Sequence, residues 1–362
     1  MGFTLSVQNY RGLESVEWSP RGVCALAGPN GGGKTTLLDV LELLRHAYEV
    51  NFVRAVEHHG GAYGFRRFGA PKERGVVFGL RVENATPWEY RPSFSGPAFS
   101  SAELIGIPRE RRELRPESDG RLGIRLLADT GGAEAESLRP LVRLLTSYRF
   151  HRRYSLSDIV EHGSPVTSET ALSPSGANVF SVLRNWRDQR TFRDRSAFVI
   201  DSLKSMFPDF FADLDFETGP GIVSGQVVTT TFEDAVPARL APDGWLTALL
   251  HLAAVASAEP GGVVSIDEPE NALHPYAIRA LLDAFRDWSA KRDVTILLAT
   301  HSPVVLDQFK SAPDRVYIME PGHDVLPVSL EKLKPAEWLA HFSFGDLYTH
   351  LKVGAPKRDG AT

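Results

Sequence analysis

The stretch that decides the fold is Gly28-Pro29-Asn30-Gly31-Gly32-Gly33-Lys34-Thr35, and it fits the pattern G-x-x-x-x-G-K-S/T. An apolar, β-favouring run precedes it at residues 23–27, and a long apolar run of helix formers follows it at residues 36–44. A strand, a tight glycine turn and a helix in this order form the setting of a phosphate-binding loop. We therefore expect an α/β fold in which this turn cradles a phosphate.

Each residue type in the stretch suits that task. Glycines lack a Cβ atom, so the backbone can curl with its N–H groups pointing at the phosphate. The N-terminus of the helix adds partial positive charge at the same place. Lys34 supplies a cation to the β- and γ-phosphates, and the Thr35 hydroxyl is a ligand for Mg²⁺. The nucleotide-binding residues expected here are Asn30, Gly31, Gly32, Gly33, Lys34, Thr35 and Thr36.

The composition bounds the class of protein. A length of 362 residues with 43% apolar residues predicts one large domain or two lobes with a full core. The net charge of −5 means that any nucleic-acid surface has to be a local patch. No apolar run approaches the roughly 18 residues that span a bilayer, and the N-terminus carries no secretory leader. We expect a cytoplasmic protein without a membrane partner, whose lone Cys24 is a small buried hydrophobe.

The N-terminal part reads as a hairpin followed by further antiparallel strands. Residues 3–7 alternate between apolar and polar, and a turn leads to a returning strand at residues 13–18. Arg11 in that turn is either a surface charge or a group that reaches a nucleotide beside the hairpin. Antiparallel strands are predicted at residues 76–82 and 88–94.

Two stretches in this region carry weaker signals. Residues 95–137 are rich in Pro, Gly, Ser and Arg, and we expect an exposed excursion there. The pair His58 and His59 suggests a metal, but no Cys or carboxylate lies at ligand spacing, so a loop is favoured.

The middle of the chain is basic in places. Regular structure is predicted to resume at residues 141–150, followed by the basic cluster Arg149, His151, Arg152 and Arg153. Residues 155–175 read as a linker into a helical segment at residues 178–207, where arginines alternate with Trp186 and Phe192. Such a pattern could track a nucleic-acid backbone. Because aspartates are interspersed, a solvated amphipathic helix is the favoured interpretation.

Two apolar strands in the C-terminal half end in polar residues. Residues 262–266 lead to Asp267 and Glu268, and residues 294–299 lead to Thr300 and His301. Strand ends at one sheet edge can reach one site. We expect Asp267 to hold Mg²⁺ opposite Thr35, and Glu268 to orient or deprotonate an attacking water. His301 is then a candidate sensor of the γ-phosphate.

Asp243 and Gly244 open an apolar helix at residues 246–256 and are weaker candidates. A helix N-terminus of this kind can face an anion. An ordinary Pro-Asp-Gly turn is the alternative.

With these pieces in this order, the chain resembles the ATP-binding cassette ATPases of the RecF/SMC/OLD type, and in particular the standalone bacterial AAA_21-like ATPases. Residues 28–35 are similar to their Walker A motif and residues 263–268 to their Walker B motif. Residues 270–275 are similar to the D-loop, and residues 299–303 to the His switch. Residues 9–13 and 338–348 also look like the N-terminal motif and the end of such proteins.

The resemblance implies a P-loop NTPase of the ABC ATPase head type with an antiparallel β subdomain and a helical insertion. On that pattern residues 1–150 are an N-terminal ATPase lobe, 151–225 a helical insertion, 226–350 a C-terminal lobe and 351–362 a flexible tail. The implied ligands are ATP and Mg²⁺, catalysis by Glu268, His301 and Lys34, and Arg11 beside the nucleotide. Two subunits would sandwich ATP between one Walker pair and the partner's signature helix at Asp243 and Gly244.

The sequence also departs from the pattern of that class. Pro242 stands where the signature motif usually has Ser, and no confident Q-loop glutamine is found, with His151 near that position. The chain has no long heptad arm of the SMC type, and no Toprim nuclease is expected after the His switch.

Three functions therefore compete. The first is an ATP-driven dimerising switch in DNA repair or anti-phage defence, which controls a separate nuclease or effector and has nucleic acid as a further candidate partner. The second is a nucleotide-gated scaffold with little hydrolysis, and the third is the nucleotide-binding subunit of a transporter.

Overall fold

A parallel sheet joins distant parts of the chain in this computed structural model. Its strands stand in the order β16-β15-β3-β14-β13-β8, and all are parallel except β16. Their bounds are β3 (Val23–Ala27), β8 (Arg149–His151), β13 (Val263–Asp267), β14 (Thr295–Thr300), β15 (Val316–Ile318) and β16 (Val328–Ser329). The structure describes residues 2–69, 71, 74–83, 87–95, 100–107, 110–115, 120–320, 325–335, 337, 339, 341 and 343–349.

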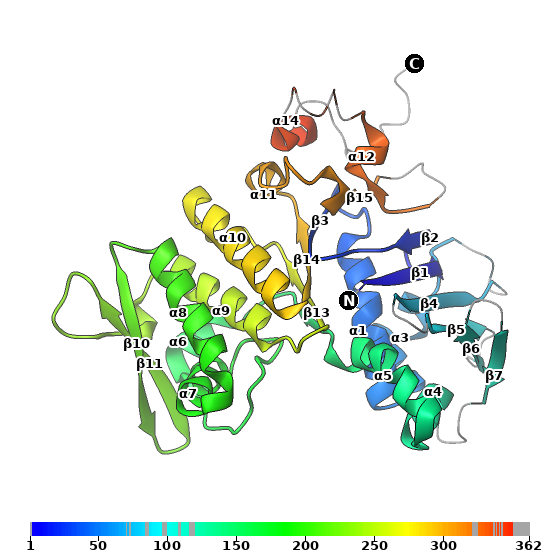
Figure 1. The fold of residues 1–362 in the computed structure, drawn as a ribbon, viewed down its shortest axis with the longest axis horizontal. Helices are drawn as coiled ribbons and strands as arrows, with labels where there is room; N and C mark the ends of the chain where they lie inside the picture. The colour runs from blue at the N-terminus through cyan, green and yellow to red at the C-terminus, as the bar shows by residue number, and fades with distance from the viewer. Residues whose placement is uncertain are drawn as a thin grey trace.

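The central strands are apolar throughout because helices cover both faces of the sheet. Successive side chains of a strand point to opposite faces, and in β3 Ala25 packs into one hydrophobic core while Leu26 packs into the other. α1 (Lys34–Glu49) covers one face, and α9 (Asp243–Ser257) and α10 (Pro275–Arg292) cover the other (Figure 1). Cys24 is 1% exposed, which confirms the prediction of a buried hydrophobe.

An antiparallel sheet packs against α1 in the second of these cores. Its strand order is β2-β1-β4-β5-β6-β7. The bounds are β1 (Gly2–Tyr10), β2 (Leu13–Trp18), β4 (Val76–Glu83), β5 (Glu89–Ser95), β6 (Ser100–Ile107) and β7 (Glu110–Leu114). β1 and β2 pair with Val7 opposite Val16, which confirms the predicted hairpin. Helices α2 (Phe52–His58), α3 (Gly61–Phe65), α4 (Gly123–Asp129) and α5 (Gly132–Ser147) complete this wing.

Two predictions for this wing are wrong. The expected exposed excursion at residues 95–137 contains β6, β7, α4 and the beginning of α5, and Ile105 and Ile124 within it are fully buried. The expected loop at His58 and His59 is the end of a helix. The Asn51 side chain caps α2 by accepting from Arg54 N, and the apolar face of α2 is buried.

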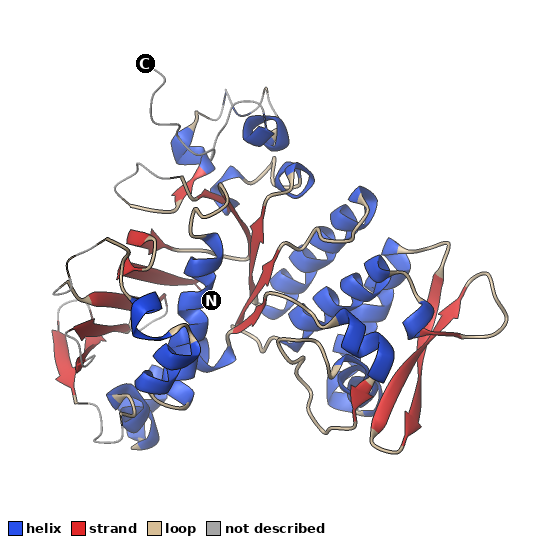
Figure 2. Ribbon diagram, turned by 180° about the vertical axis from the view of Figure 1, so that it is seen from behind, coloured by secondary structure: helices blue, strands red, loops and turns tan. Residues whose placement is uncertain are grey.

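The opposite wing combines helices with a second antiparallel sheet (Figure 2). Its sheet has the order β10-β11-β12, with β9 also paired to β11. The elements are α6 (Leu156–His162), β9 (Ser164–Pro165), α7 (Val179–Asp188), η1 (Arg190–Phe192), α8 (Arg193–Met206), β10 (Phe211–Gly219), β11 (Ile222–Thr229), β12 (Val236–Pro237) and η2 (Ala238–Leu240). The predicted boundary at residue 225 falls inside β11.

Two arginines of this wing form ion pairs within the protein. Arg187 pairs with Asp215 at 3.1 Å, and the buried Arg195 pairs with Glu259 at 2.9 Å. Trp186 is fully buried in the core beneath them. α7 thus packs as an amphipathic helix, as the favoured interpretation expected.

After β14 the chain runs through short elements: α11 (Pro303–Asp307), η3 (Pro313–Arg315), α12 (Leu330–Leu333) and α14 (Phe344–Thr349). α14 is tied to α11 by a hydrogen bond from Gly345 N to Asp307 Oδ1 of 2.7 Å. The predicted flexible tail at 351–362 lies outside the described residues, as do Trp338, Ala340 and Phe342 of the family-like end. No helix among the described residues combines the length and apolarity that a bilayer crossing requires.

Candidate nucleotide-binding site

The carboxyl ends of the central parallel strands meet at one edge of the sheet, where ligands bind in α/β folds. A cavity of about 640 Å³ lies there. It is lined by Asn30, Gly31, Gly33, Lys34, Thr35, Thr36, Arg152, Arg153, Asp267, Glu268, Asn271 and His301. The structure thus brings Lys34, Thr35, Asp267 and His301 around a single space, although they lie far apart in the chain.

The loop between β3 and α1 adopts a conformation that requires glycine. Gly28 has φ 153°, and a Cβ there would lie 2.6 Å from the Met319 carbonyl oxygen. Gly33, with φ 93°, would place a Cβ 2.8 Å from Leu13 Cδ2. Replacing Gly28 or Gly33 by any other residue would therefore strain the backbone and bring the new Cβ into collision with its neighbours. Gly32 lies within the turn and donates its N–H to the Pro29 carbonyl at 3.0 Å.

Lys34 is a buried cation held by carbonyl oxygens. The residue is only 6% exposed. Its Nζ donates to Gly28 O at 2.8 Å and to Pro29 O at 3.2 Å. Burial lowers the pKa of Lys34 to about 8, against the opposing effect of nearby carboxylates, first of all Asp267. A cation desolvated in this way gains strongly from an anionic ligand.

Thr35 and Asp267 form the oxygen pair on which a metal could sit. The Thr35 hydroxyl donates to Asp267 Oδ2 at 3.0 Å, and this contact joins α1 to the end of β13. Burial raises the pKa of the Asp267 carboxyl, and the Thr35 hydrogen bond opposes that shift. A hydroxyl and a carboxylate are the donors that Mg²⁺ takes in phosphate sites, so the residues fit the expected ion.

Glu268 reaches the same cavity through an unusual backbone conformation. Consecutive strand residues point to opposite faces, yet Asp267 and Glu268 both line the pocket. Glu268 has φ 52°, in the left-handed region, while its N–H donates to Ala299 O at 2.8 Å. Asn271 Nδ2 donates to Glu268 Oε2 at 2.9 Å and so holds the carboxylate.

Glu270 fixes the end of the neighbouring strand. Its Oε1 accepts from the Thr300 hydroxyl at 2.8 Å and from His301 N at 3.1 Å. Burial lowers the pKa of His301, and the Lys34 cation lowers it further, against the pull of Glu268. The imidazole is therefore held toward its neutral form at the pocket wall.

Sequence reasoning missed three of the lining residues, Arg152, Arg153 and Asn271. The register that pairs Ile266 with His151 brings the residues after β8 level with Asp267. The sequence did hold a signal for Arg152 and Arg153, because their basic cluster directly follows an apolar run. Such a run is a candidate for a buried parallel strand, whose end would lie at the same sheet edge.

Four of the expected nucleotide-binding residues, Gly32, Arg11, Asp243 and Gly244, are not among those that line this cavity. Arg11 donates from Nε to Gly64 O at 2.7 Å and from Nη1 to Asp39 at 2.8 Å, and it also bonds His59 O. Asp243 is exposed at the start of α9. A Cβ on Gly244 would lie 2.7 Å from Ala272 O, so α9 begins against the segment that follows Glu268.

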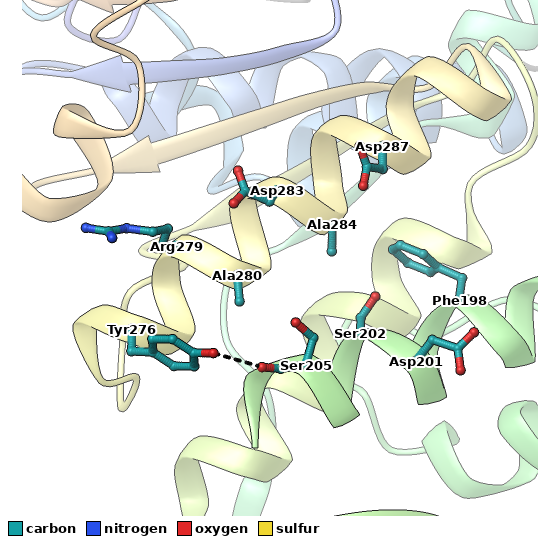
Figure 3. Close-up of a pocket in the computed structure, with 10 residues that line it drawn as sticks. All are labelled: Phe198, Asp201, Ser202, Ser205, Tyr276, Arg279, Ala280, Asp283, Ala284 and Asp287. Carbon is teal, nitrogen blue, oxygen red and sulfur yellow. Dashed lines mark hydrogen bonds between the residues drawn. The ribbon is translucent and has the colours of Figure 1, made fainter. Parts of the chain in front are cut away.

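A second cavity, of about 420 Å³, lies between α8 and α10 (Figure 3). Asp201, Asp283 and Asp287 are part of its wall, with Arg279 as the cation of the lining. The Tyr276 hydroxyl donates to Ser205 O at 3.4 Å across it. Because carboxylates predominate among its described charged residues, this groove does not suit a phosphate.

Solved structures with a similar fold include heads of SMC proteins. One is the SMC head bound to the C-winged helix domain of ScpA, with a TM-score of 0.57 and 15% identity, covering 91% of this chain and 99% of that chain. Another, derived from Pyrococcus furiosus, is an SMC head with an extended coiled coil bound to the C-terminal domain of ScpA. Its TM-score is 0.50 at 12% identity, covering 91% and 96% of the two chains.

The sequence comparisons reach the family level. No curated protein sequence matches the chain. A family model described as "AAA domain, putative AbiEii toxin, Type IV TA system" matches residues 23–307, which include the stretches that resemble the Walker motifs and the His switch. The predicted fold class is confirmed by this match together with the SMC heads. The chain belongs to the AAA_21 family and shares the fold of SMC head domains.

Proposed function

We propose that the protein binds ATP with Mg²⁺ in the cavity at the sheet edge and hydrolyses it. The observation that carries this proposal is the convergence of Lys34, Thr35, Asp267, Glu268 and His301 on one space. Family membership supports it, because the match covers every one of these residues.

Each residue takes one part in the chemistry. The glycine turn and Lys34 hold the phosphates, and Thr35 with Asp267 would hold Mg²⁺, which neutralises phosphate charge when bound. Glu268, held at Oε2 by Asn271, accepts a proton from water aligned with the γ-phosphate. His301 and Arg153 line the cavity as candidate donors to the phosphate oxygens.

We further propose that ATP closes a homodimer. α9 begins at Asp243 after an exposed Pro242, which offers no side-chain cap to the helix. The first N–H groups of a helix are unpaired within it and favour an anion. A partner's ATP would occupy that position, with backbone N–H groups replacing the usual signature hydroxyl.

Such a dimer would act as a switch for a separate effector, such as a nuclease, in DNA repair or anti-phage defence. The family description names a toxin system, and the SMC heads were solved with a bound ScpA domain. Both support a head that works through another polypeptide. A nucleotide-gated scaffold with little hydrolysis is the second candidate, and Pro242 in the signature favours it.

The test is ATP turnover of the wild type, Glu268→Gln and the control Glu161→Gln, whose carboxylate is exposed on α6. Removing a general base costs about 10²–10⁴ in rate, so Glu268→Gln should lose at least about 100-fold while it still binds ATP. The same variant with ATP and Mg²⁺ should elute as a dimer. Equal turnover in wild type and Glu268→Gln contradicts the hydrolysis proposal. ATP-dependent dimers without wild-type turnover support the scaffold.

A further inference from the structure

Three histidines from two helices converge on the surface of the antiparallel wing. His46 lies in the last turn of α1, His58 ends α2, and His59 caps that helix. One ring nitrogen of each lies within 4.8 Å of those of the other two. We propose that His46, His58 and His59 form a binding site for a divalent transition-metal ion, with Zn²⁺ as the best fit.

The ring arrangement suits ligands of one ion. The ring planes meet at 85° for His46 and His58, 61° for His46 and His59, and 57° for His58 and His59. None of these pairs is stacked, so their nitrogens can point toward a common centre. Around tetrahedral zinc, with Zn–N near 2.0–2.1 Å, ligand nitrogens are about 3.3 Å apart. His58 is exposed and His46 half-buried, so binding would require these two side chains to rotate and close the remaining distance.

His59 is already oriented for such a role. Its Nδ1 lies 3.1 Å from Asp39 Oδ1, and its side chain is only 5% exposed. Its Nε2 is buried and has no hydrogen-bond partner among the described residues. A buried polar atom without a partner is costly. A carboxylate on the far nitrogen is the arrangement that fixes the tautomer of metal-binding histidines.

The surroundings favour a cation over an anion. The last carbonyl groups of α1 give its C-terminal end partial negative charge, and His46 lies in that turn. Asp39 places a carboxylate beside His59 Nδ1, which leaves Nε2 of that ring for an ion. Three imidazoles leave a fourth position for water, as in other three-histidine zinc sites. A bound ion would fasten α2 to α1.

The experiment is a Zn²⁺ titration of full-length, untagged protein stripped with a chelator. Millimolar Mg²⁺ is kept present so that the oxygen site at Thr35 and Asp267 does not take up zinc. We expect one Zn²⁺ per chain at micromolar affinity or better. Co²⁺ in its place should give the visible absorption of a tetrahedral nitrogen site.

The variants locate the site. His58→Ala and His46→Ala should each weaken Zn²⁺ binding by more than the about 10- to 100-fold that loss of an outer hydrogen-bond partner costs. The exposed His162→Ala, on α6, is the control and should bind like the wild type. Because His58 is itself exposed, its replacement should leave the fold intact.

Two outcomes overturn the proposal. One is a wild type with no saturable Zn²⁺ binding below about 100 µM. The other is equal affinity in wild type, His46→Ala and His58→Ala. Neither outcome bears on the nucleotide site, whose test is ATP binding and turnover without zinc.

Discussion

The two ends of α1 present opposite kinds of polar site. At its N-terminus, Lys34 and Thr35 stand beside a glycine turn and face a cavity suited to phosphate. Near its C-terminus, His46 meets two histidines of α2 around a space suited to a cation. Lys34 and His46 are about 18 Å apart along the helix axis. The helix dipole favours an anion at the first and a cation at the second.

The sites also differ in what builds them. At the N-terminal end the backbone makes the site, because the glycine conformations and the strand ends place the N–H groups and side chains. At the C-terminal end the packing of two helices makes it. Asp39 lies between, bonded to Arg11 on one side and His59 on the other. The comparison teaches that one helix can serve two ligands when each end is supported by separate partners.

Lys34→Ala should produce the largest change. Removing one member of a buried, charged hydrogen-bonded pair costs about 2–5 kcal/mol, so ATP affinity should fall by about 30-fold or more. Zn²⁺ affinity at the histidines should stay within about twofold. Calorimetric titration with each ligand checks both, and Lys204→Ala, exposed on α8, is the control. If Lys34→Ala retained its ATP affinity, the N-terminal end of α1 would not be the phosphate site.

The residues of the two ends were not equally predictable from sequence. Lys34, Thr35 and Asp267 were predicted because a fixed spacing sets the local backbone and parallel strand ends meet at one edge. His46 was missed because it lies 12 positions before His58 in the chain, and only the packing of α1 against α2 brings them together. The spacing of His46 and His58 along the sequence does not predict a contact that depends on how two helices pack.

The excursion at residues 95–137 was mispredicted for a related reason. Glu103 reads as a surface residue, yet it is fully buried and accepts hydrogen bonds from Gly123 N at 2.8 Å and Tyr90 Oη at 2.8 Å. Burial raises the pKa of its carboxyl. A buried polar side chain satisfied by distant donors interrupts the apolar pattern from which strands are predicted.

Arg11→Ala tests whether Arg11 contributes to nucleotide binding or to the packing around Asp39 and His59. The resemblance assigned Arg11 to the nucleotide, whereas its guanidinium contacts Asp39, Gly64 O and His59 O. Because the ion pair with Asp39 is largely buried, we expect a loss of about 2 kcal/mol in unfolding free energy. ATP affinity should change less than threefold. Denaturant unfolding and nucleotide titration measure the two effects, and a tenfold loss of ATP affinity would return Arg11 to the nucleotide end.

Asp39→Asn tests how the Asp39 carboxylate contributes to the proposed histidine site at the C-terminal end of α1. The amide oxygen can still accept from His59 Nδ1 but carries no charge, so Zn²⁺ affinity should fall by about tenfold, the lower range for an outer partner. Arg11→Ala also breaks the Asp39–Arg11 ion pair but leaves the Asp39–His59 bond in place. It should therefore lose less zinc affinity than Asp39→Asn. The reverse order in parallel zinc titrations would show that Asp39 does not act on the metal site through His59.

Glu42→Gln should have the smallest effect, and it asks whether the two ends are independent. Thr35, Asp39, Glu42 and His46 follow one another at four-, three- and four-residue steps, which places them along one face of α1. Glu42 binds Arg45, which Glu49 also holds. Because partly exposed ion pairs contribute only about 0–1 kcal/mol, stability should fall by less than about 0.5 kcal/mol.

Neither the ATP nor the Zn²⁺ affinity of Glu42→Gln should move beyond about twofold, since Glu42 is paired with Arg45 and acts on its neighbour His46 only through its charge. Titrating each ligand into the variant, and then into the variant already loaded with the other ligand, measures the coupling directly. A joint shift of both affinities would mean that the polar face transmits between the ends. In that case zinc at His46 would regulate the nucleotide site along α1.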